Sequence, residues 1–395
     1  MKRNNNDKIK YSNSICLGIY LRFKDIKSSP LMKFHVDSDI TIAETLPAYF
    51  YKSQEVFDLL KEKVFVKSWQ WIGDLNILLP QPETVSPLVL LEDYVNEPLI
   101  CVRDANNIIK CFTNVCTHRG NILFHQPETL KNLTCMYHGR RFGLDGRFQF
   151  MPEFKEAKSF PRVCDSLKAF SVKQFANHLF VGLEPDFDFN DVIEGMSQRI
   201  GFLPLNAFKH DSALDKSYTI NCHWALYCDN YLEGFHIPFV HDDLNEALDY
   251  GNYKTLIYDH FNLQIGYSDT SEDTFNLPED HVDFRKNVAA YYYWIFPNMM
   301  FNFYPWGLSI NIVKPIGMDK TQVSFITYVY DESKLNRGAG ALLDKVEQED
   351  EFVVEGVHKG LKSRYYKAGR FSPTREQGVH HFHLLLARYM NKDLD

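Results

Sequence analysis

The spacing of hydrophobic and polar residues predicts a small β domain followed by a larger mixed domain. Within residues 88–181, short apolar runs separated by Gly, Pro and Asn predict strands. Two stretches, 43–71 and 339–366, carry apolar residues at helical spacing, and a further helical stretch lies near the end of the chain. The aromatic-rich segments 291–304 and 321–330 predict long strands. We therefore expect an α+β fold.

These patterns predict boundaries along the chain. The β domain is expected at residues 71–185 and the larger domain at residues 186–395, with residues 32–70 as a helical part that belongs to the larger domain. Residues 1–31 are polar and irregular, which predicts an N-terminal extension. Its apolar stretch, 15–21, is short and lacks a small-residue cleavage site, so we do not interpret it as a targeting signal.

Composition and charge exclude several classes of protein. Apolar residues make up 45% and charged residues 24% of the chain, as in ordinary globular proteins. The net charge of −8 argues against nucleic acid or an anionic membrane as the main partner, and no apolar run approaches the ~20 residues that cross a bilayer. The eight cysteines are scattered, unlike those of a secreted disulfide scaffold. A cytoplasmic protein with reduced thiols is expected.

The first candidate for chemistry is a pair of mixed Cys/His loops. Cys116 and His118 flank one residue, and after sixteen residues Cys135 and His138 flank two. Zinc fingers usually group Cys with Cys and His with His, whereas each half here is mixed. Two thiolates on one iron and two imidazoles on the other suit a [2Fe–2S] cluster, whose potential rises when neutral ligands replace thiolates. A structural zinc site and unrelated core residues are the alternatives.

A second candidate metal site lies in the larger domain. Residues 224–236 have helical character, so that Glu233 and His236 share one face at about 100° per residue. Pro238 disfavours continuation of this helix, so the chain can turn and bring His241 to the same ion. Two histidines and one carboxylate form the facial triad of oxygen-activating Fe(II) enzymes.

The carboxylate of such a triad is predicted in the helix at 339–366. Its apolar residues form one stripe: Leu343, Val346, Val354, Val357 and Leu361. Asp350 lies at the centre of the stripe, whereas Glu349 and Glu351 fall about 100° to either side and Glu347 about 60° off. A core-facing carboxylate needs a partner, which a metal ion or a buried arginine can supply. Asp350 is thus the first candidate ligand and Glu347 the weaker one.

The sequence resembles the Rieske non-haem iron oxygenase α subunits, and among them the group of choline monooxygenase, glycine betaine demethylase and carnitine oxygenase. Four segments carry the resemblance: 116–120, 135–139, 229–241 and 349–363. It extends over about residues 45–390. The family usually has Trp after the His-Gly of the second loop, where this chain has Arg140 and Arg141. We expect this difference to alter the surface where a reductase or a neighbouring subunit docks.

The resemblance implies an all-β Rieske domain inserted ahead of a helix-grip catalytic domain that has an antiparallel sheet and a long C-terminal helix. It also implies a head-to-tail homotrimer, in which the cluster of one subunit serves the mononuclear iron of its neighbour. The implied roles are cluster ligands for Cys116, His118, Cys135 and His138, iron ligands for His236, His241 and Asp350, and a bridge between the two centres for Glu233.

The implied reaction is O₂-dependent hydroxylation of a C–H bond in a quaternary or tertiary methylammonium compound such as choline, betaine or carnitine. A separate NAD(P)H-dependent flavin and iron–sulfur reductase is expected, because the sequence contains no dinucleotide or flavin fingerprint. Aromatic residues that could bind a cation, or simply fill the core, are Tyr291, Tyr292, Tyr293, Trp294, Phe296, Tyr304 and Trp306. The alternatives are an oxygenase for an aromatic or aliphatic acid, a pure electron carrier and a zinc-stabilised interaction protein.

Overall fold

The computed structural model describes residues 33–392, except 248, 269–272, 336 and 342. The predicted extension at residues 1–31 therefore lies outside the described residues. The predicted α+β class is confirmed. Among the described residues, no helix combines the length and the apolar character that crossing a membrane requires. These residues form two compact units: one of 72–90 and 96–181, the other of 33–71, 91–95 and 182–392.

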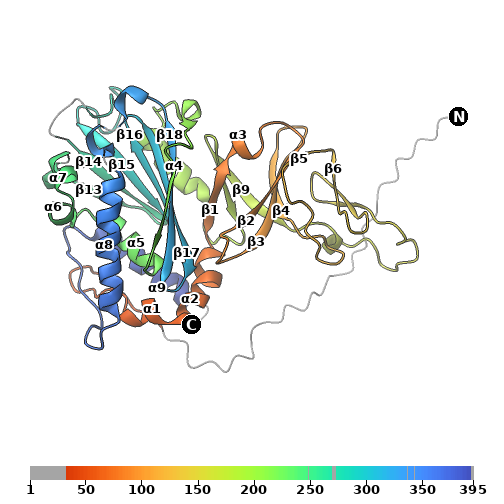
Figure 1. Ribbon diagram of the computed structural model, residues 1–395, viewed down its shortest axis with the longest axis horizontal. Helices are drawn as coiled ribbons and strands as arrows, with labels where there is room; N and C mark the ends of the chain where they lie inside the picture. The colour runs from red at the N-terminus through yellow and green to blue at the C-terminus, as the bar shows by residue number, and fades with distance from the viewer. Residues whose placement is uncertain (1–32, 248, 269–272, 336, 342, 393–395) are drawn as a thin grey trace. The chain divides into compact units, whose positions relative to one another are not determined.

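The first unit is built from short strands (Figure 1). One sheet has the order β1-β10-β9-β4-β3-β2-β5, and a smaller one has the order β6-β7-β8. The strands are β1 (Trp69–Asp74), β2 (Thr84–Leu90), β3 (Glu97–Arg103), β4 (Ile109–Thr113), β5 (Glu128–Thr129), β6 (Asn132–Thr134), β7 (Arg141–Gly143), β8 (Phe148–Phe150), β9 (Ala169–Phe175) and β10 (His178–Gly182), with the short helices α3 (Leu75–Leu78) and η2 (Val163–Asp165). Their buried side chains form one core, to which Cys116 and Cys135 belong.

The second unit is an antiparallel sheet of order β11-β18-β17-β16-β15-β14-β13, in which β12 also pairs with β18. Its strands are β11 (Lys209–His210), β12 (Lys216–Ile220), β13 (Lys254–Ile257), β14 (Phe261–Tyr267), β15 (Val288–Ile295), β16 (Met299–Tyr304), β17 (Gly307–Gly317) and β18 (Lys320–Val329). The predicted strand at 291–304 is thus a hairpin of β15 and β16. β15 and β16 are buried along their whole length, so both faces of the sheet are covered.

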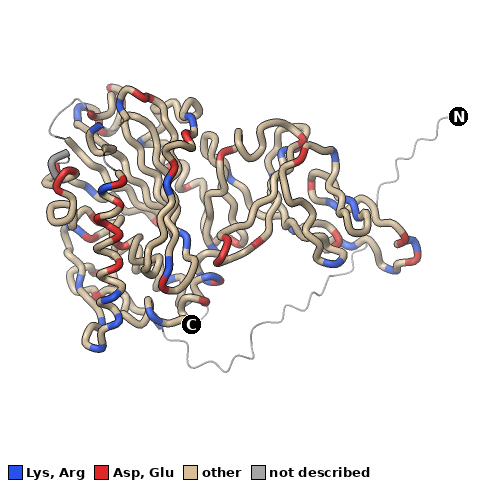
Figure 2. Tube along the Cα trace, viewed as in Figure 1, with Lys and Arg blue, Asp and Glu red and all other residues tan. Residues whose placement is uncertain are grey.

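Helices complete the second unit. They are α1 (Ala48–Lys52), α2 (Gln54–Leu60), α4 (Phe189–Ile200), α5 (Trp224–Tyr231), α6 (Ile237–Val240), α7 (Asp242–Ala247), α8 (Leu343–Leu361) and α9 (Gln377–Asn391), with the shorter turns η1 (Lys61–Phe65), η3 (Leu205–Ala207), η4 (Tyr250–Asn252), η5 (Glu332–Lys334) and η6 (Gly338–Gly340). α5 contacts β17, α8 and α9, and α9 also contacts β13. The long helix α8 carries many acidic residues (Figure 2).

The predicted helix at 43–71 is wrong in its continuity. Ser53 separates α1 from α2, because its hydroxyl accepts a hydrogen bond from the Val56 N–H at 3.3 Å and caps the second helix. The helical segment ends before Trp69, which is the first residue of β1. Trp69 is nevertheless buried, as its apolar spacing predicts.

The predicted apolar stripe of α8 is wrong at one position. Val357 is 46% exposed, whereas Glu347 and His358 on this helix are buried. Both polar residues have partners, since Glu347 accepts a hydrogen bond from a tyrosine and the Nδ1 of His358 accepts one from the amide of His223. Hydrophobicity alone could not identify this face because paired polar residues share it.

Candidate metal sites

The first mixed loop folds as a tight turn around Cys116. The Cys116 N–H donates to the Asn121 carbonyl oxygen at 2.8 Å, and the Gly120 N–H donates to the Cys116 carbonyl oxygen at 3.0 Å. Gly120 has a φ of 72°, in the left-handed region that favours glycine. The sequence thus places glycine where the loop reverses.

The second loop repeats these bonds at equivalent positions. The Cys135 N–H donates to the Arg140 carbonyl oxygen at 2.8 Å, and the Gly139 N–H donates to the Cys135 carbonyl oxygen at 2.9 Å. Gly139 has a φ of 69°. The two loops therefore present their cysteines from the same kind of turn.

The four predicted cluster residues lie together, with thiols inside and imidazoles outside. Cys116 and Cys135 are only 2% and 1% exposed. Burial, together with the neighbouring Cys135 thiol, raises the pKa of Cys116. The rings of His118 and His138 are 4.8 Å apart, and His138 is exposed. Two thiols and two imidazoles in this arrangement fit a [2Fe–2S] cluster with mixed ligands.

Arg140 corrects one expectation about the second loop. It is 1% exposed, so its side chain does not contribute to the docking surface that we expected it to alter. Its guanidinium donates to the Asp165 carboxylate at 2.8 Å and lies over the Phe148 ring at 5.0 Å from the centroid. The adjacent Arg141 is exposed. Arg140 is thus a buried structural cation of the cluster domain.

The second site begins where α5 ends, earlier than predicted. The helix stops at Tyr231, so Glu233 and His236 do not share a helical face. Glu233 instead accepts hydrogen bonds from the N–H groups of Phe235 and, at 3.1 Å, of His236, which stabilises the turn into α6. Pro238 lies in the first turn of α6, where its missing N–H has no cost.

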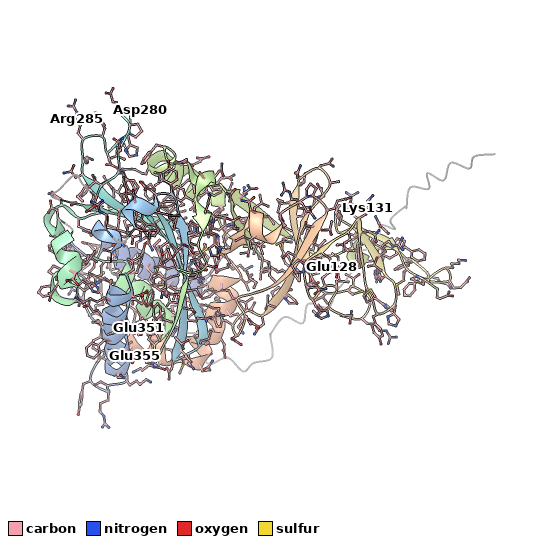
Figure 3. All side chains as sticks on the ribbon, turned by 45° about the horizontal axis from the view of Figure 1, so that its top comes forward. Glu128, Lys131, Asp280, Arg285, Glu351 and Glu355 are labelled. Carbon is pink, nitrogen blue, oxygen red and sulfur yellow. The ribbon has the colours of Figure 1, made fainter. Side chains whose placement is uncertain are left out.

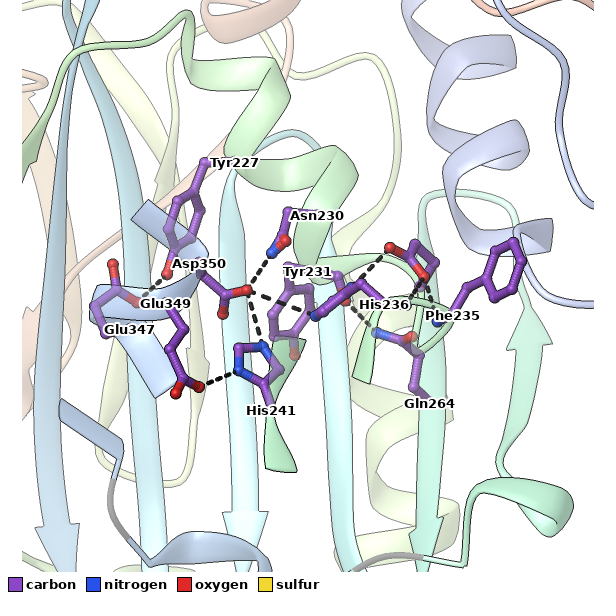
Figure 4. A network of polar contacts seen from close by, with 11 residues as sticks. Tyr227, Asn230, Tyr231, Phe235, His236, His241, Gln264, Glu347, Glu349 and Asp350 are labelled. Atoms are coloured by element: carbon purple, nitrogen blue, oxygen red, sulfur yellow. Dashed lines mark hydrogen bonds and ion pairs between the residues drawn. The ribbon is translucent and has the colours of Figure 1, made fainter. Parts of the chain in front are cut away.

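His236, His241 and Asp350 come together despite this difference (Figure 4). One ligand atom of each lies within 4.8 Å of the others. The Asp350 Oδ1 atom is 3.0 Å from the His241 Nε2 atom and 3.6 Å from the His236 Nε2 atom. Burial lowers the pKa of His241, but the carboxylates of Asp350 and Glu349 outweigh it and raise the pKa overall.

Each triad histidine also contacts a second carboxylate through its Nδ1 atom. Glu233 lies 2.7 Å from the His236 Nδ1 atom, and Glu349 lies 2.7 Å from the His241 Nδ1 atom. Each carboxylate selects a proton on Nδ1 and leaves Nε2 free for a metal. Sequence reasoning missed the role of Glu349, although its place beside Asp350 was the available signal. Two imidazoles and a carboxylate fit a facial triad.

The sequence left two alternatives open: a buried arginine as the partner of Asp350, and Glu347 as the carboxylate ligand. Among the described residues, Asp350 contacts His236, His241 and the amide of Asn230, which donates at 2.6 Å, rather than an arginine. Glu347, the weaker candidate ligand, instead accepts a hydrogen bond from the Tyr227 hydroxyl at 2.6 Å. Burial raises the pKa of Glu347 to about 8.

A cavity of about 120 Å³ opens beside the triad. Its aromatic lining residues are Tyr227, Tyr231, Tyr253, Tyr292, Tyr304 and Phe325. Of the aromatic residues proposed from the sequence, only Tyr292 and Tyr304 line this cavity, and the rings of these two are 5.8 Å apart. The other five are buried in the core and do not line the cavity, which agrees with the alternative that these residues simply fill the core. The tyrosines of α5 were missed, although Tyr227 and Tyr231 have helical spacing.

Comparisons with known proteins identify two domains, one around each candidate metal site. The family model of the Rieske [2Fe–2S] domain matches residues 86–161, and that of the ring hydroxylating alpha subunit catalytic domain matches residues 209–392. Chloroplastic choline monooxygenase of Arabidopsis thaliana is 29% identical over 365 residues, which cover 87% of this chain and 82% of that protein. The carnitine monooxygenase oxygenase subunit of Escherichia coli K12 is 28% identical over 362 residues, which cover 88% of this chain and 94% of that protein.

Solved structures share the fold. A quaternary ammonium Rieske monooxygenase has a TM-score of 0.70 at 24% identity, covering 89% of this chain and 96% of that one. Naphthalene 1,2-dioxygenase from a Rhodococcus species has a TM-score of 0.64 at 17% identity, covering 88% of this chain and 95% of that one. The two domains confirm the predicted cofactors, a [2Fe–2S] cluster and a mononuclear iron. The assignment of individual ligands stays a prediction.

Proposed function

Because the chain belongs to the Rieske-type non-haem iron oxygenases and is an oxidoreductase, we propose that it is the oxygenase component of a multicomponent monooxygenase. Its substrate is a quaternary or tertiary methylammonium compound, of which choline, betaine and carnitine are examples. The observation that carries this proposal is a triad of His236, His241 and Asp350 at the wall of a cavity lined by tyrosines.

The catalytic roles follow from the donor atoms. His236, His241 and Asp350 would hold the iron, and Cys116, His118, Cys135 and His138 the cluster. When bound, the iron supplies O₂ activation for C–H hydroxylation, and the cluster supplies electrons. The overall reaction takes up O₂, two electrons and two protons, and yields a hydroxylated carbon and water.

The residues around the triad prepare it for this chemistry. Glu233 and Glu349 fix the orientation and the Nδ1 proton of the two histidines. The cavity would hold the substrate beside the triad, between its tyrosine walls. The tyrosine faces suit a methylammonium group, because aromatic rings attract cations.

The exposure of His138 supports electron exchange with another protein. His138 is exposed, and its loop neighbours Met136 and Tyr137 are 87% and 58% exposed. An apolar surface at the imidazole edge suits docking of an electron donor or of a second subunit. We therefore include in the proposal an NAD(P)H-dependent flavin and iron–sulfur reductase and a head-to-tail homotrimer. Glu233, at the back of His236, is the proposed link between the cluster of one subunit and the iron of the next.

The cell compartment is also part of the proposal. Six cysteines among the described residues are free thiols, which favours a reducing compartment such as the cytoplasm.

The test of the proposal is O₂ uptake that depends on substrate. The purified protein is supplied with NADH and a surrogate ferredoxin-type reductase, and a panel of methylammonium compounds is compared with aromatic and aliphatic acids. We expect O₂ consumption and hydroxylated or demethylated product only with the methylammonium compounds. Turnover of the acids alone would support the other oxygenase class and contradict the proposed substrate.

A further inference from the structure

Glu347 is a buried carboxylate in the cavity wall that the metal triad does not use. The side chain lines the cavity, and the residue is 4% exposed. Its Oε2 atom accepts the hydrogen bond of the Tyr227 hydroxyl at 2.6 Å (Figure 4). Its Oε1 atom is buried and has no hydrogen-bond partner among the described residues. Burial of a carboxylate is unfavourable unless a cation or hydrogen-bond donors compensate it. We therefore expect the Oε1 atom to bind a partner.

Neighbouring cations on α8 are engaged elsewhere. Lys345 pairs with Asp243 and lies 3.9 Å from Glu349, and Lys359 pairs with Glu355 at 3.5 Å. The triad histidines meet Asp350, which is one helical turn beyond Glu347. The partner of Glu347 is thus expected to enter through the cavity.

The rest of the cavity indicates what kind of partner fits. Among the described residues that line it, the basic side chains are the two triad histidines, and there is no Lys or Arg with which an anionic group could pair. Tyr292 and Tyr304, from paired strands, offer aromatic faces, and Tyr231 and Tyr253 add two more. A carboxylate next to aromatic faces is complementary to an ammonium group, which the carboxylate attracts by charge and the rings attract through their faces.

We propose that Glu347 is a specificity-determining residue, whose carboxylate pairs with the positive charge of a substrate ammonium group held among the cavity tyrosines. This inference rests on the proposed function and makes it more specific, because it assigns recognition of the charge to one residue. Recognition of the methyl groups then falls to the aromatic walls. Loss of the carboxylate should weaken binding of the cation but not of an uncharged molecule of the same shape.

The experiment compares charge and shape separately. Choline and its neutral carbon isostere 3,3-dimethylbutan-1-ol are titrated calorimetrically, without O₂, into protein that carries both metal centres. Carnitine and γ-butyrobetaine are titrated in the same way. The variants are Glu347→Gln, which keeps an acceptor for Tyr227, and Glu347→Leu, which replaces the buried carboxyl group by an apolar side chain of similar size. The control is Glu351→Gln, which makes the same substitution on the same helix, α8 (Figure 3), at a residue that does not line the cavity. Iron and sulfide are determined in every preparation.

We expect both Glu347 variants to bind choline about tenfold more weakly or worse, with unchanged affinity for the isostere and unchanged iron content. Glu351→Gln should behave as the original protein. Equal choline affinity in the Glu347 variants and the original protein would overturn the role of Glu347 and leave the proposed function intact. Loss of iron in the Glu347 variants would also overturn it, because Glu347 would then act on the metal. If the original protein binds neither choline nor carnitine nor γ-butyrobetaine, the proposed substrate class itself is wrong.

Discussion

The guanidinium of Arg140 and the carboxylate of Asp165 form a buried ion pair, with 2.8 Å between Nη2 and Oδ1. The main-chain carbonyl oxygen of Asp165 accepts a second bond from Arg140 at 2.9 Å and another from the Thr117 hydroxyl at 2.8 Å. Thr117 belongs to the first cluster loop and Arg140 follows the second. Asp165 therefore joins both loops that present the predicted cluster ligands.

Breaking this pair should destabilise the cluster domain. Arg140→Ala leaves the Asp165 carboxylate buried without its main cation, which costs about 3–5 kcal/mol when a buried pair loses one partner. We expect a lower unfolding temperature and less cluster per chain, measured by calorimetry and by labile sulfide. Arg141→Ala is the matched control, because Arg141 is exposed. Equal sulfide content and equal unfolding temperature in the two variants would contradict the bracing role of Arg140.

The metal content of the protein tests the predicted ligand sets. Purified protein should be red-brown, with two irons and two labile sulfides in the cluster and one further iron per chain. Cys116→Ser or His138→Ala should remove the colour, because each takes away a cluster ligand, while the second site still binds Fe(II). Iron and sulfide assays with absorption spectra measure this. A colourless protein with stoichiometric zinc would contradict both sets.

The candidate metal ligands could be predicted from residue types and short spacings, which can be read directly from the sequence. The two mixed loops and their glycines could be predicted because each loop folds through bonds among its own residues, as in Cys135 to Arg140. Helical arithmetic predicted His236 and Asp350 as candidate ligands, and the structure brings them together. The shared helical face assumed for Glu233 and His236 was wrong, because α5 ends at Tyr231.

Other residues depended on contacts between segments that are distant in the sequence. From the sequence alone, Arg140 is expected at the surface. In the structure, Asp165 and two phenylalanines enclose its guanidinium. Likewise, the burial of Glu347 depends on Tyr227, which is on another helix. Periodicity cannot report such pairs, because it measures only the face of one element.

Glu349 should support iron binding without acting as a ligand. Glu349→Gln cannot accept the His241 Nδ1 proton equally well, so the ring loses its fixed orientation. We expect Fe(II) affinity to fall by roughly 10–100-fold, as is usual when such a support is lost. Titration of the apo site with Fe(II) measures it, with Glu351→Gln as the control of equal charge. Unchanged affinity would show that His241 needs no carboxylate behind it.

Asp283 predicts an acid-sensitive contribution to stability away from both metal sites. Its buried carboxylate pairs with Arg199 and with Lys286 at 2.9 Å, and accepts from the Tyr291 hydroxyl at 3.1 Å. Burial raises the pKa of Asp283, but the two cations outweigh it and lower the pKa overall. Because the folded-state pKa is below the unfolded value, the charge stabilises the fold above about pH 4, and this stabilisation is lost as pH falls through the folded-state pKa.

Asp283→Asn should therefore destabilise the protein at neutral pH by roughly 3 kcal/mol. Urea unfolding of the variant and the original protein from pH 7 down to pH 3 measures the difference, which should shrink as the pH falls below about 4. Exposed Asp280→Asn is the control for a general charge effect (Figure 3). A difference that does not change with pH would contradict the electrostatic role of Asp283.

The link proposed for Glu233 can be separated from a structural role. Glu233→Gln can still accept the N–H bonds of Phe235 and His236 through its amide oxygen, so the turn into α6 should persist. The amide cannot take up a proton or carry a charge, so it cannot couple His236 to a cluster histidine of a neighbouring subunit. Fe(II) is supplied in excess to offset any weaker support of His236. Both metal centres should then remain loaded, and a reductase should still reduce the cluster. Oxidation of that cluster by O₂ with substrate, followed by stopped-flow absorbance, should slow by orders of magnitude.

Two comparisons decide how the Glu233→Gln result is interpreted. His236→Ala and Asp350→Ala should empty the mononuclear site itself, because each removes a ligand. If Glu233→Gln also loses this iron, Glu233 is needed to hold the metal, and its contact with the His236 Nδ1 atom is its main role. If the variant turns over normally, the electron path does not pass through Glu233, and the trimer arrangement needs support from the mass of the assembly in solution. Slow cluster oxidation with both centres loaded would support the proposed link between subunits.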